Sequence, residues 1–195
     1  MNSNIPTPSS NEIERYFKYW ETLEHYVLQE GSLNKLFGET YPNNTDINDI
    51  LIKVSSLNDF YSTNIYSVFP VAKRILELDV DNRLKQGDES LVNDIAPISI
   101  SGKDKYFYSF ATKYCSHHNP IHFPIYDYYV EKVLMYFKKK DKFSEYRKTE
   151  LKDYKVFKKV LLEFREYYGL AKYSLKEIDL YLWQAGKEYF PKRYK

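Results

Sequence analysis

The spacing of the apolar side chains constrains this chain most, because they recur at three and four residues along most of its length. That period places them on one face of an α-helix, whereas a strand would alternate polar and apolar residues. No segment shows a convincing alternation, so we expect an all-α fold. The pattern predicts helices over residues 12–29, 46–54, 64–78, 88–96, 104–116, 127–137, 153–168 and 174–185.

Capping residues mark several of these boundaries. Asp and Ser side chains accept hydrogen bonds from the first turn of a helix, and Gly adopts the left-handed conformation that ends one. Pro70 lacks a backbone donor, so its helix either bends there or begins near Phe69. The expected caps and turns are Asp46, Asp88, the Ser174 and Glu177 capping box, Gly31, Gly169 and the Ser101–Gly102 turn.

Length and composition indicate one globular domain over residues 11–195, after a flexible lead at 1–10 that holds two Pro and three Ser. No apolar run approaches the roughly 20 residues of a membrane span, and the polar start has no signal-like apolar core. We therefore expect a cytoplasmic, monomeric protein without a membrane partner. The single cysteine, Cys115, excludes an internal disulfide and fits a reducing compartment.

The charge is distributed unevenly. Lys and Arg number 11 against 18 Asp and Glu in residues 1–131, but 18 against 9 in residues 132–195. The basic final third predicts phosphate contacts from Lys138, Lys139 and Lys140 and their neighbours, unless these are solvated helix faces. The 21 Tyr and 12 Phe suit base stacking beside phosphates, although a general compositional bias accounts for them equally well.

The stretch SFATKYCSHHNPIHFPIYDYYV, residues 109–130, sets Lys113 on one predicted helix and Asp127 at the start of the next. An aspartate at a helix N-terminus is kept ionised by the unpaired amides and the helix dipole, so it can face a cleft as a carboxylate. Asp127 as a simple N-cap is the alternative.

The segment SFATKYCSHHNPIHFPIYD resembles a bacterial family with the fold of 8-oxoguanine DNA glycosylase, within the helix-hairpin-helix superfamily. LNDFYST at 57–63, GDESLVNDIA at 87–96 and IDLYLWQAGK at 178–187 add to the resemblance, which spans most of the chain after Ser55. It implies a helical DNA glycosylase that acts on DNA without a cofactor.

By this resemblance, Asp127 corresponds to the catalytic aspartate and Lys113 to the lysine nucleophile. The family's glycine-rich hairpin is reduced here to Gly102, and Lys113 lies well inside its predicted helix. Lys103 and Lys105 stand nearer the hairpin, where they compete for the nucleophile's role and are candidate DNA contacts. We therefore expect a monofunctional enzyme, with lyase activity as the alternative.

A flipped base needs an aromatic pocket to receive it. Tyr61, Tyr126 and Trp183 are candidate walls, and Asn58 is a candidate reader of a base edge, with core packing and turn capping as the alternative roles.

Cys115, His117, His118 and His122 suggest a metal site, because thiolate and imidazole bind zinc. None of the common paired spacings is present, so no metal is expected. His117, His118 and Asn119 are instead candidate contacts to a backbone phosphate, or caps of their helix.

The sequence thus predicts excision of a damaged or modified base, in repair or in defence against phage with modified DNA. A catalytically silent DNA-binding module and a metal-dependent hydrolase are the competing hypotheses. The sequence does not identify the base.

Overall fold

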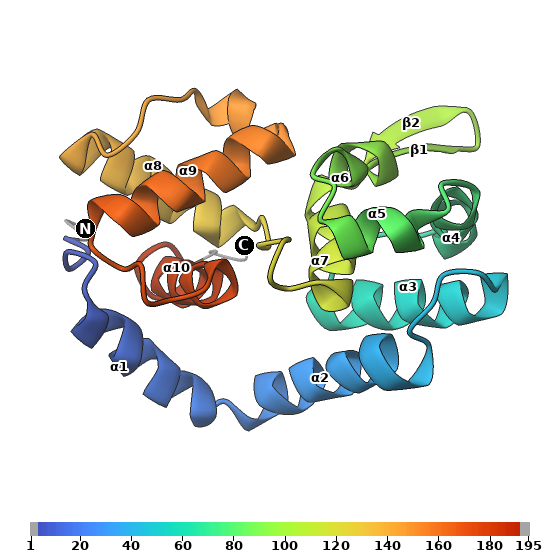
Figure 1. The fold of residues 1–195 in the computed structure, drawn as a ribbon, viewed down its shortest axis with the longest axis horizontal. Helices are drawn as coiled ribbons and strands as arrows, with labels where there is room; N and C mark the ends of the chain where they lie inside the picture. Colours follow the sequence, from blue (N-terminus) through green and yellow to red (C-terminus); the bar gives the residue numbers. More distant parts are fainter. Residues whose placement is uncertain (1–3, 192–195) are drawn as a thin grey trace. The chain divides into compact units, whose positions relative to one another are not determined.

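The computed structural model describes residues 4–191, which are mostly helical (Figure 1). These residues group into two compact units, one from 4–24 and 126–191 and the other from 25–125. That residues 11–195 form a single domain, as composition indicates, stays a prediction. Among the described residues, no helix is long and apolar enough to cross a membrane.

The first unit joins the two ends of the described chain. Its helices are α1 (Ser10–Glu21), α8 (Tyr128–Asp141), the 3-10 helix η2 (Lys148–Lys152), α9 (Tyr154–Tyr167) and α10 (Leu175–Tyr189). Helix α10 packs against α8, α1 and α9, and Figure 1 shows α1 and α9 beside it. Aromatic side chains fill this core, among them Tyr16, Phe137, Phe157, Phe164 and Tyr181.

The second unit begins within α2 (Glu24–Lys35). It continues through the π-helical turn η1 (Leu36–Thr40), α3 (Ile47–Tyr61), α4 (Val68–Glu77), α5 (Val80–Gln86), α6 (Ser90–Ile95) and α7 (Tyr108–His118). Helix α7 packs against α3 and α6, and nearly all of its side chains are buried.

The capping predictions are confirmed except at Gly31, which lies inside α2 and does not end a helix. Asp46 accepts from the amide of Asn48 at 2.7 Å, and Asp88 accepts from the amide of Ser90 at 3.0 Å. Ser174 and Glu177 form the capping box of α10. Gly169 follows α9 with φ +66°, and α4 begins at Val68, so Pro70 lies in its first turn and does not bend it. Helices α3 and α8 extend further than predicted, to Tyr61 and Asp141.

The prediction of one helix over 12–29 is wrong, because the chain breaks between α1 and α2 at Thr22 and Leu23. Neither residue is a helix breaker, and the apolar spacing continues across them. The break falls where α1 ends its packing on α10 and the chain passes into the second unit, whose core receives Leu33 of α2.

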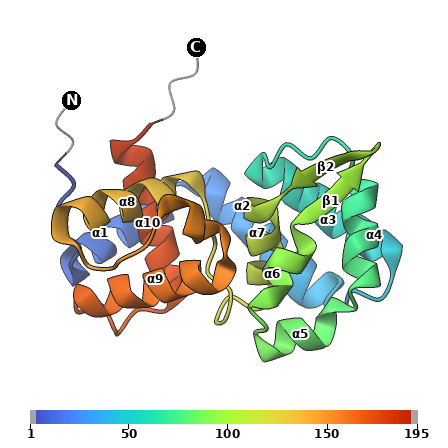
Figure 2. The ribbon, with the colours of Figure 1, turned by 90° about the horizontal axis from the view of Figure 1, so that it is seen from above.

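The absence of strands was also wrongly predicted. Strands β1 (Pro97–Ile100) and β2 (Lys103–Tyr106) form an antiparallel hairpin, drawn as paired arrows in Figure 2, and α7 begins at Tyr108 and not near 104. Ser101 and Gly102 form the expected turn with φ of +50° and +73°. Every residue of β2 is exposed, so this strand lacks the polar–apolar alternation that identifies a strand, and the alternation of β1 covers only four residues.

The lead before α1 is anchored where the structure describes it. Ile5 is 1% exposed, and its amide donates to the Tyr136 hydroxyl at 3.2 Å. Residues 1–3 of the lead expected to be flexible lie outside the described range.

Candidate functional site

Asp127 is the N-cap residue of α8. Its Oδ1 accepts a hydrogen bond from the Tyr129 amide at 2.9 Å, and its side chain is partly exposed. The capping alternative is therefore confirmed, and the partial exposure of the residue is compatible with a catalytic role.

Gly186 lets α10 approach the backbone of α8 next to this cap. A Cβ at position 186 would lie 2.5 Å from the Tyr129 Cβ and 2.7 Å from the Tyr129 carbonyl oxygen. Only glycine permits this contact without a shift of one helix. The residue belongs to the segment IDLYLWQAGK, although no role for its glycine was predicted from the sequence.

Tyr126, predicted as a pocket wall, is a packed residue. Its ring meets Phe157 edge to face at 5.4 Å, and the Lys152 Nζ lies 4.0 Å from the ring centroid. The hydroxyl donates to Glu131. Burial, followed by this hydrogen bond, raises the pKa of the Tyr126 phenol. Its ring is thus engaged within the unit that carries Asp127.

Trp183, the other predicted wall in this unit, is partly exposed on α10. It meets Trp20 edge to face at 6.0 Å, and the Lys187 Nζ lies 4.5 Å from its ring.

Lys113 is 3% exposed in the middle of α7. Its Nζ donates to the Ser109 hydroxyl at 2.6 Å and lies 5.2 Å from the Tyr61 ring centroid. Lys113 belongs to the 25–125 unit and Asp127 to the other. Their meeting in one cleft stays a prediction.

Tyr61 and Asn58 occupy the end of α3. The Tyr61 hydroxyl lies 3.0 Å from the His117 Nε2, which brings together two of the predicted residues. The Asn58 side chain organises the following turn, accepting from the Ile65 amide at 2.9 Å and donating to the Ile65 carbonyl at 3.1 Å. The turn-capping alternative is the role seen for Asn58.

Gly102, Lys103 and Lys105 lie on the β-hairpin of the second unit. Lys103 and Lys105 are exposed on β2, where they pair in register with Ile100 and Ile98. The two lysines are therefore accessible to a phosphate backbone, away from the α7 position of Lys113.

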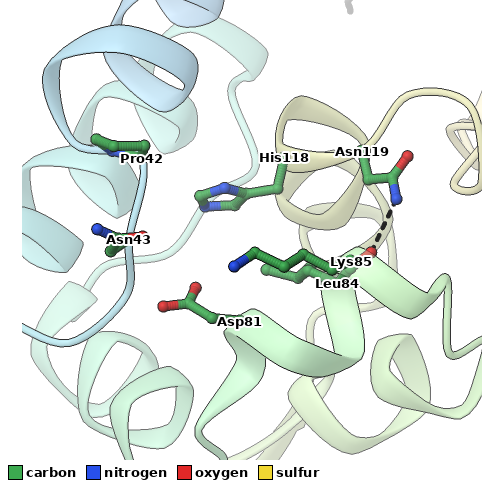
Figure 3. Close-up of a pocket in the computed structure, with 7 residues that line it drawn as sticks. All are labelled: Pro42, Asn43, Asp81, Leu84, Lys85, His118 and Asn119. Atoms are coloured by element: carbon green, nitrogen blue, oxygen red, sulfur yellow. Dashed lines mark hydrogen bonds between the residues drawn. The ribbon is translucent and has the colours of Figure 1, made fainter.

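His118 and Asn119 line a pocket of about 280 Å³ in the second unit, together with Pro42, Asn43, Asp81, Leu84 and Lys85 (Figure 3). The Asn119 amide donates to the Leu84 carbonyl at 2.8 Å. Figure 3 shows Asp81, Lys85 and His118 pointing toward one another. The end of α7 and the Asp81 carboxylate disfavour an anion here, whereas the Lys85 ammonium favours one, so the phosphate contact stays a prediction.

A buried network behind this pocket was missed from the sequence. Lys53, fully buried, donates to the Tyr41 and Asn43 carbonyls at 3.0 and 2.8 Å and to the Asn44 Oδ1 at 2.7 Å. Burial lowers the pKa of Lys53 to about 8. Its position on the apolar face of α3, between Ile50 and Val54, is the signal that identifies it.

The same network holds His118 neutral. Asn44 donates to Asp81 Oδ1 at 2.6 Å, and its amide nitrogen lies 3.2 Å from the His118 Nε2. An amide nitrogen only donates, so Nε2 accepts and carries no proton. Burial, together with the Lys53 charge, lowers the pKa of His118 to about 3.

The metal hypothesis finds no support in the described part of the chain, where no group of three or more His, Cys, Asp or Glu side chains is placed to hold an ion. Cys115 is buried, which raises the pKa of its thiol. His118 faces Lys53, and His122 packs on Gly87.

Lys138, Lys139 and Lys140 form the last turn of α8. Lys138 is partly exposed and donates to the Tyr146 carbonyl, whereas Lys139 and Lys140 are exposed, and Lys140 also donates to the Ile5 carbonyl. At 1.5 Å per residue, Lys139 lies about 18 Å along the helix from Asp127. Two of the three lysines thus also bond within their own unit, and the phosphate contacts of all three stay a prediction.

Comparisons with known proteins identify relatives for most of the chain. Residues 12–122 match the family HI_0787_N, described as an N-terminal domain, and the matched segment ends before Asp127. An uncharacterized protein of Haemophilus influenzae strain Rd is 55% identical over 149 residues, which cover 76% of this chain and 71% of that protein. No solved structure matches the chain. The chain therefore belongs to the HI_0787_N family.

Proposed function

We propose that this protein is a DNA glycosylase of the helix-hairpin-helix kind, which flips a damaged or modified base out of DNA and cleaves its bond to the sugar. The observation that carries the proposal is the position of Asp127, whose carboxylate caps α8 and stays partly exposed. The resemblance of residues 109–127 to the glycosylase segment supports the same assignment.

The chemistry requires a negative charge beside the sugar. Cleavage of the bond between base and C1′ builds positive charge on the sugar, and a fixed carboxylate stabilises that charge or orients the attacking water. A charge pair at about 4 Å contributes roughly 4 kcal/mol at an effective dielectric near 20. This corresponds to about three powers of ten in rate.

The environment of Lys113 favours a monofunctional reaction. A nucleophilic amine must reach C1′, whereas Lys113 is 3% exposed in mid-helix and its Nζ donates to the Ser109 hydroxyl. In this proposal Lys113 assists through its charge and Asp127 acts with water. Lys103 and Lys105 on the hairpin and Lys139 on α8 are exposed cations available to phosphates.

The experiment is base release from a panel of oligonucleotides carrying damaged or phage-modified bases, with abasic sites revealed by alkaline cleavage. Asp127→Asn is the decisive variant, because Asn caps a helix as well as Asp and removes only the charge. We expect it to lose base release. Its circular dichroism spectrum should match that of the parent, and its affinity for DNA should stay within about twofold.

Asp153→Asn is the matched control. Asp153 caps α9 in the same unit, accepting from the Lys155 amide at 3.0 Å, so its substitution removes the same charge from an equivalent cap. It should retain full activity. Activity of Asp127→Asn within threefold of the parent would contradict the role of Asp127. DNA binding without base release from any substrate would favour the silent binding module.

A further inference from the structure

Helix α8 carries a buried carboxylate one turn after Asp127. Glu131 is 5% exposed and stands between the buried Val130 and Val133. A buried carboxylate is costly to desolvate unless hydrogen bonds and opposite charges compensate it. Its partners therefore show what it contributes to the structure.

The two partners of Glu131 lie on different elements. Its Oε2 accepts from the hydroxyl of Tyr126, and its Oε1 lies 3.0 Å from the Nζ of Lys148 on η2. The Tyr126 ring is itself fixed by Phe157 and by the Lys152 ammonium. The residue directly before Asp127 is thus attached to the helix that Asp127 caps.

This arrangement closes a loop around the cap. Asp127 bonds forward to the Tyr129 amide, and Tyr126 bonds through its side chain to Glu131, so the cap lies between two attachments to the first turns of α8. If the Glu131 side chain only filled space in the core, an apolar residue of similar volume could replace it. Here replacement would release Tyr126.

We propose that Glu131, acting through Tyr126, is a positioning residue that fixes the direction of the Asp127 carboxylate. The proposal deepens the glycosylase function and rests on it for its catalytic consequence. The fixed cap itself is a property of the fold, so it is measurable without a substrate.

The test compares Glu131→Gln, Glu131→Leu and Tyr126→Phe. Amide hydrogen exchange at Tyr129 reports the Asp127 cap, and the Lys155 amide, capped by Asp153 in the same unit, is the internal control. Glu131→Leu and Tyr126→Phe should accelerate exchange at Tyr129 by tenfold or more and leave Lys155 unchanged. Glu131→Gln still accepts from the phenol and should preserve protection.

Kinetics test the consequence for catalysis. Glu131→Leu and Tyr126→Phe should each lower kcat for base release by about tenfold with KM unchanged. The variant that combines them should lose no more than either one alone. Neither substitution should reduce the residual rate when added to Asp127→Asn. Tyr126→Phe removes one oxygen and keeps the ring, so it serves if Glu131→Leu does not fold. Unchanged Tyr129 exchange in Tyr126→Phe would overturn the proposal. An inactive parent would refute the glycosylase function, and the exchange data would still decide the positioning.

Discussion

Gly186→Ala tests whether the approach of α10 to α8 sets the place of Asp127. The added Cβ would lie 2.5 Å from the Tyr129 Cβ and 2.9 Å from the Tyr129 carbonyl carbon. Carbon atoms in contact are normally about 3.5–4.0 Å apart, so one helix must move by about 1 Å. Tyr129 donates the amide that Asp127 caps, so the shift acts directly on the cap.

The expected magnitude combines two opposing effects. Overpacking of this kind costs about 1–3 kcal/mol. Replacing glycine by alanine inside a helix contributes about 1 kcal/mol in the other direction. We expect a net loss of up to about 2 kcal/mol, or a Tm lower by up to about 4–8 °C for a protein of this size.

Gly31→Ala is the control, since a Cβ at position 31 of α2 would have no atom within 4 Å. It should stabilise the protein by up to about 1 kcal/mol. Urea denaturation followed by circular dichroism measures both changes, and base release by Gly186→Ala should fall by tenfold or more, because a 1 Å misplacement is costly for catalysis. A Gly186→Ala variant as stable as Gly31→Ala would refute the close contact of the two helices.

Acid should destabilise the protein, because His118 keeps a pKa of about 3 when folded but takes up a proton near pH 6.5 when unfolded. The free energy of unfolding measured in urea should fall by about 3 kcal/mol between pH 7 and pH 4. This fall should be largely absent in His118→Asn. A free energy of unfolding of the parent that does not change with pH would contradict the neutral imidazole. Lys113→Ala should weaken base release without abolishing it, and borohydride should trap little protein on DNA. Trapping that disappears in Lys113→Ala but survives in Lys103→Ala and Lys105→Ala would make Lys113 the nucleophile. Lys139→Gln should reduce the slope of log affinity against log salt by about one unit, and an identical slope would exclude Lys139 from the phosphate contacts.

The capping rules correctly predicted the helix starts that depend on local interactions. Asp46, Ser174 with Glu177, and Asp127 cap helices as their residue types indicate, because an N-cap bond joins residues two or three positions apart. The break at Thr22 escaped the same reasoning. The apolar spacing continues through it, and the break separates α1, which packs on α10 more than 150 residues away along the chain, from α2.

Some residues in and around the candidate site were predicted from the sequence and others were not. Asp127 was predicted from its neighbours in sequence, since a carboxylate at a helix start follows from capping chemistry. Lys53 and Glu131 were not, because a charged residue on an apolar helix face signals burial without showing which partners compensate its charge. Those partners come from separate segments, Tyr41 and Asn43 for Lys53, and Lys148 for Glu131.

The sequence by itself determined the mostly helical fold, the caps and the placement of Asp127 at the head of α8, because side-chain periodicity and capping act within one or two helical turns. Only the tertiary structure decided which polar groups are buried and how the backbone is packed around them. The Gly186 contact with Tyr129 depends on where α10 meets α8, and the ion pair of Glu131 with Lys148 depends on where η2 meets α8. Such contacts pair buried charges and pack helices closely between segments that are distant in sequence, and no local pattern encodes them.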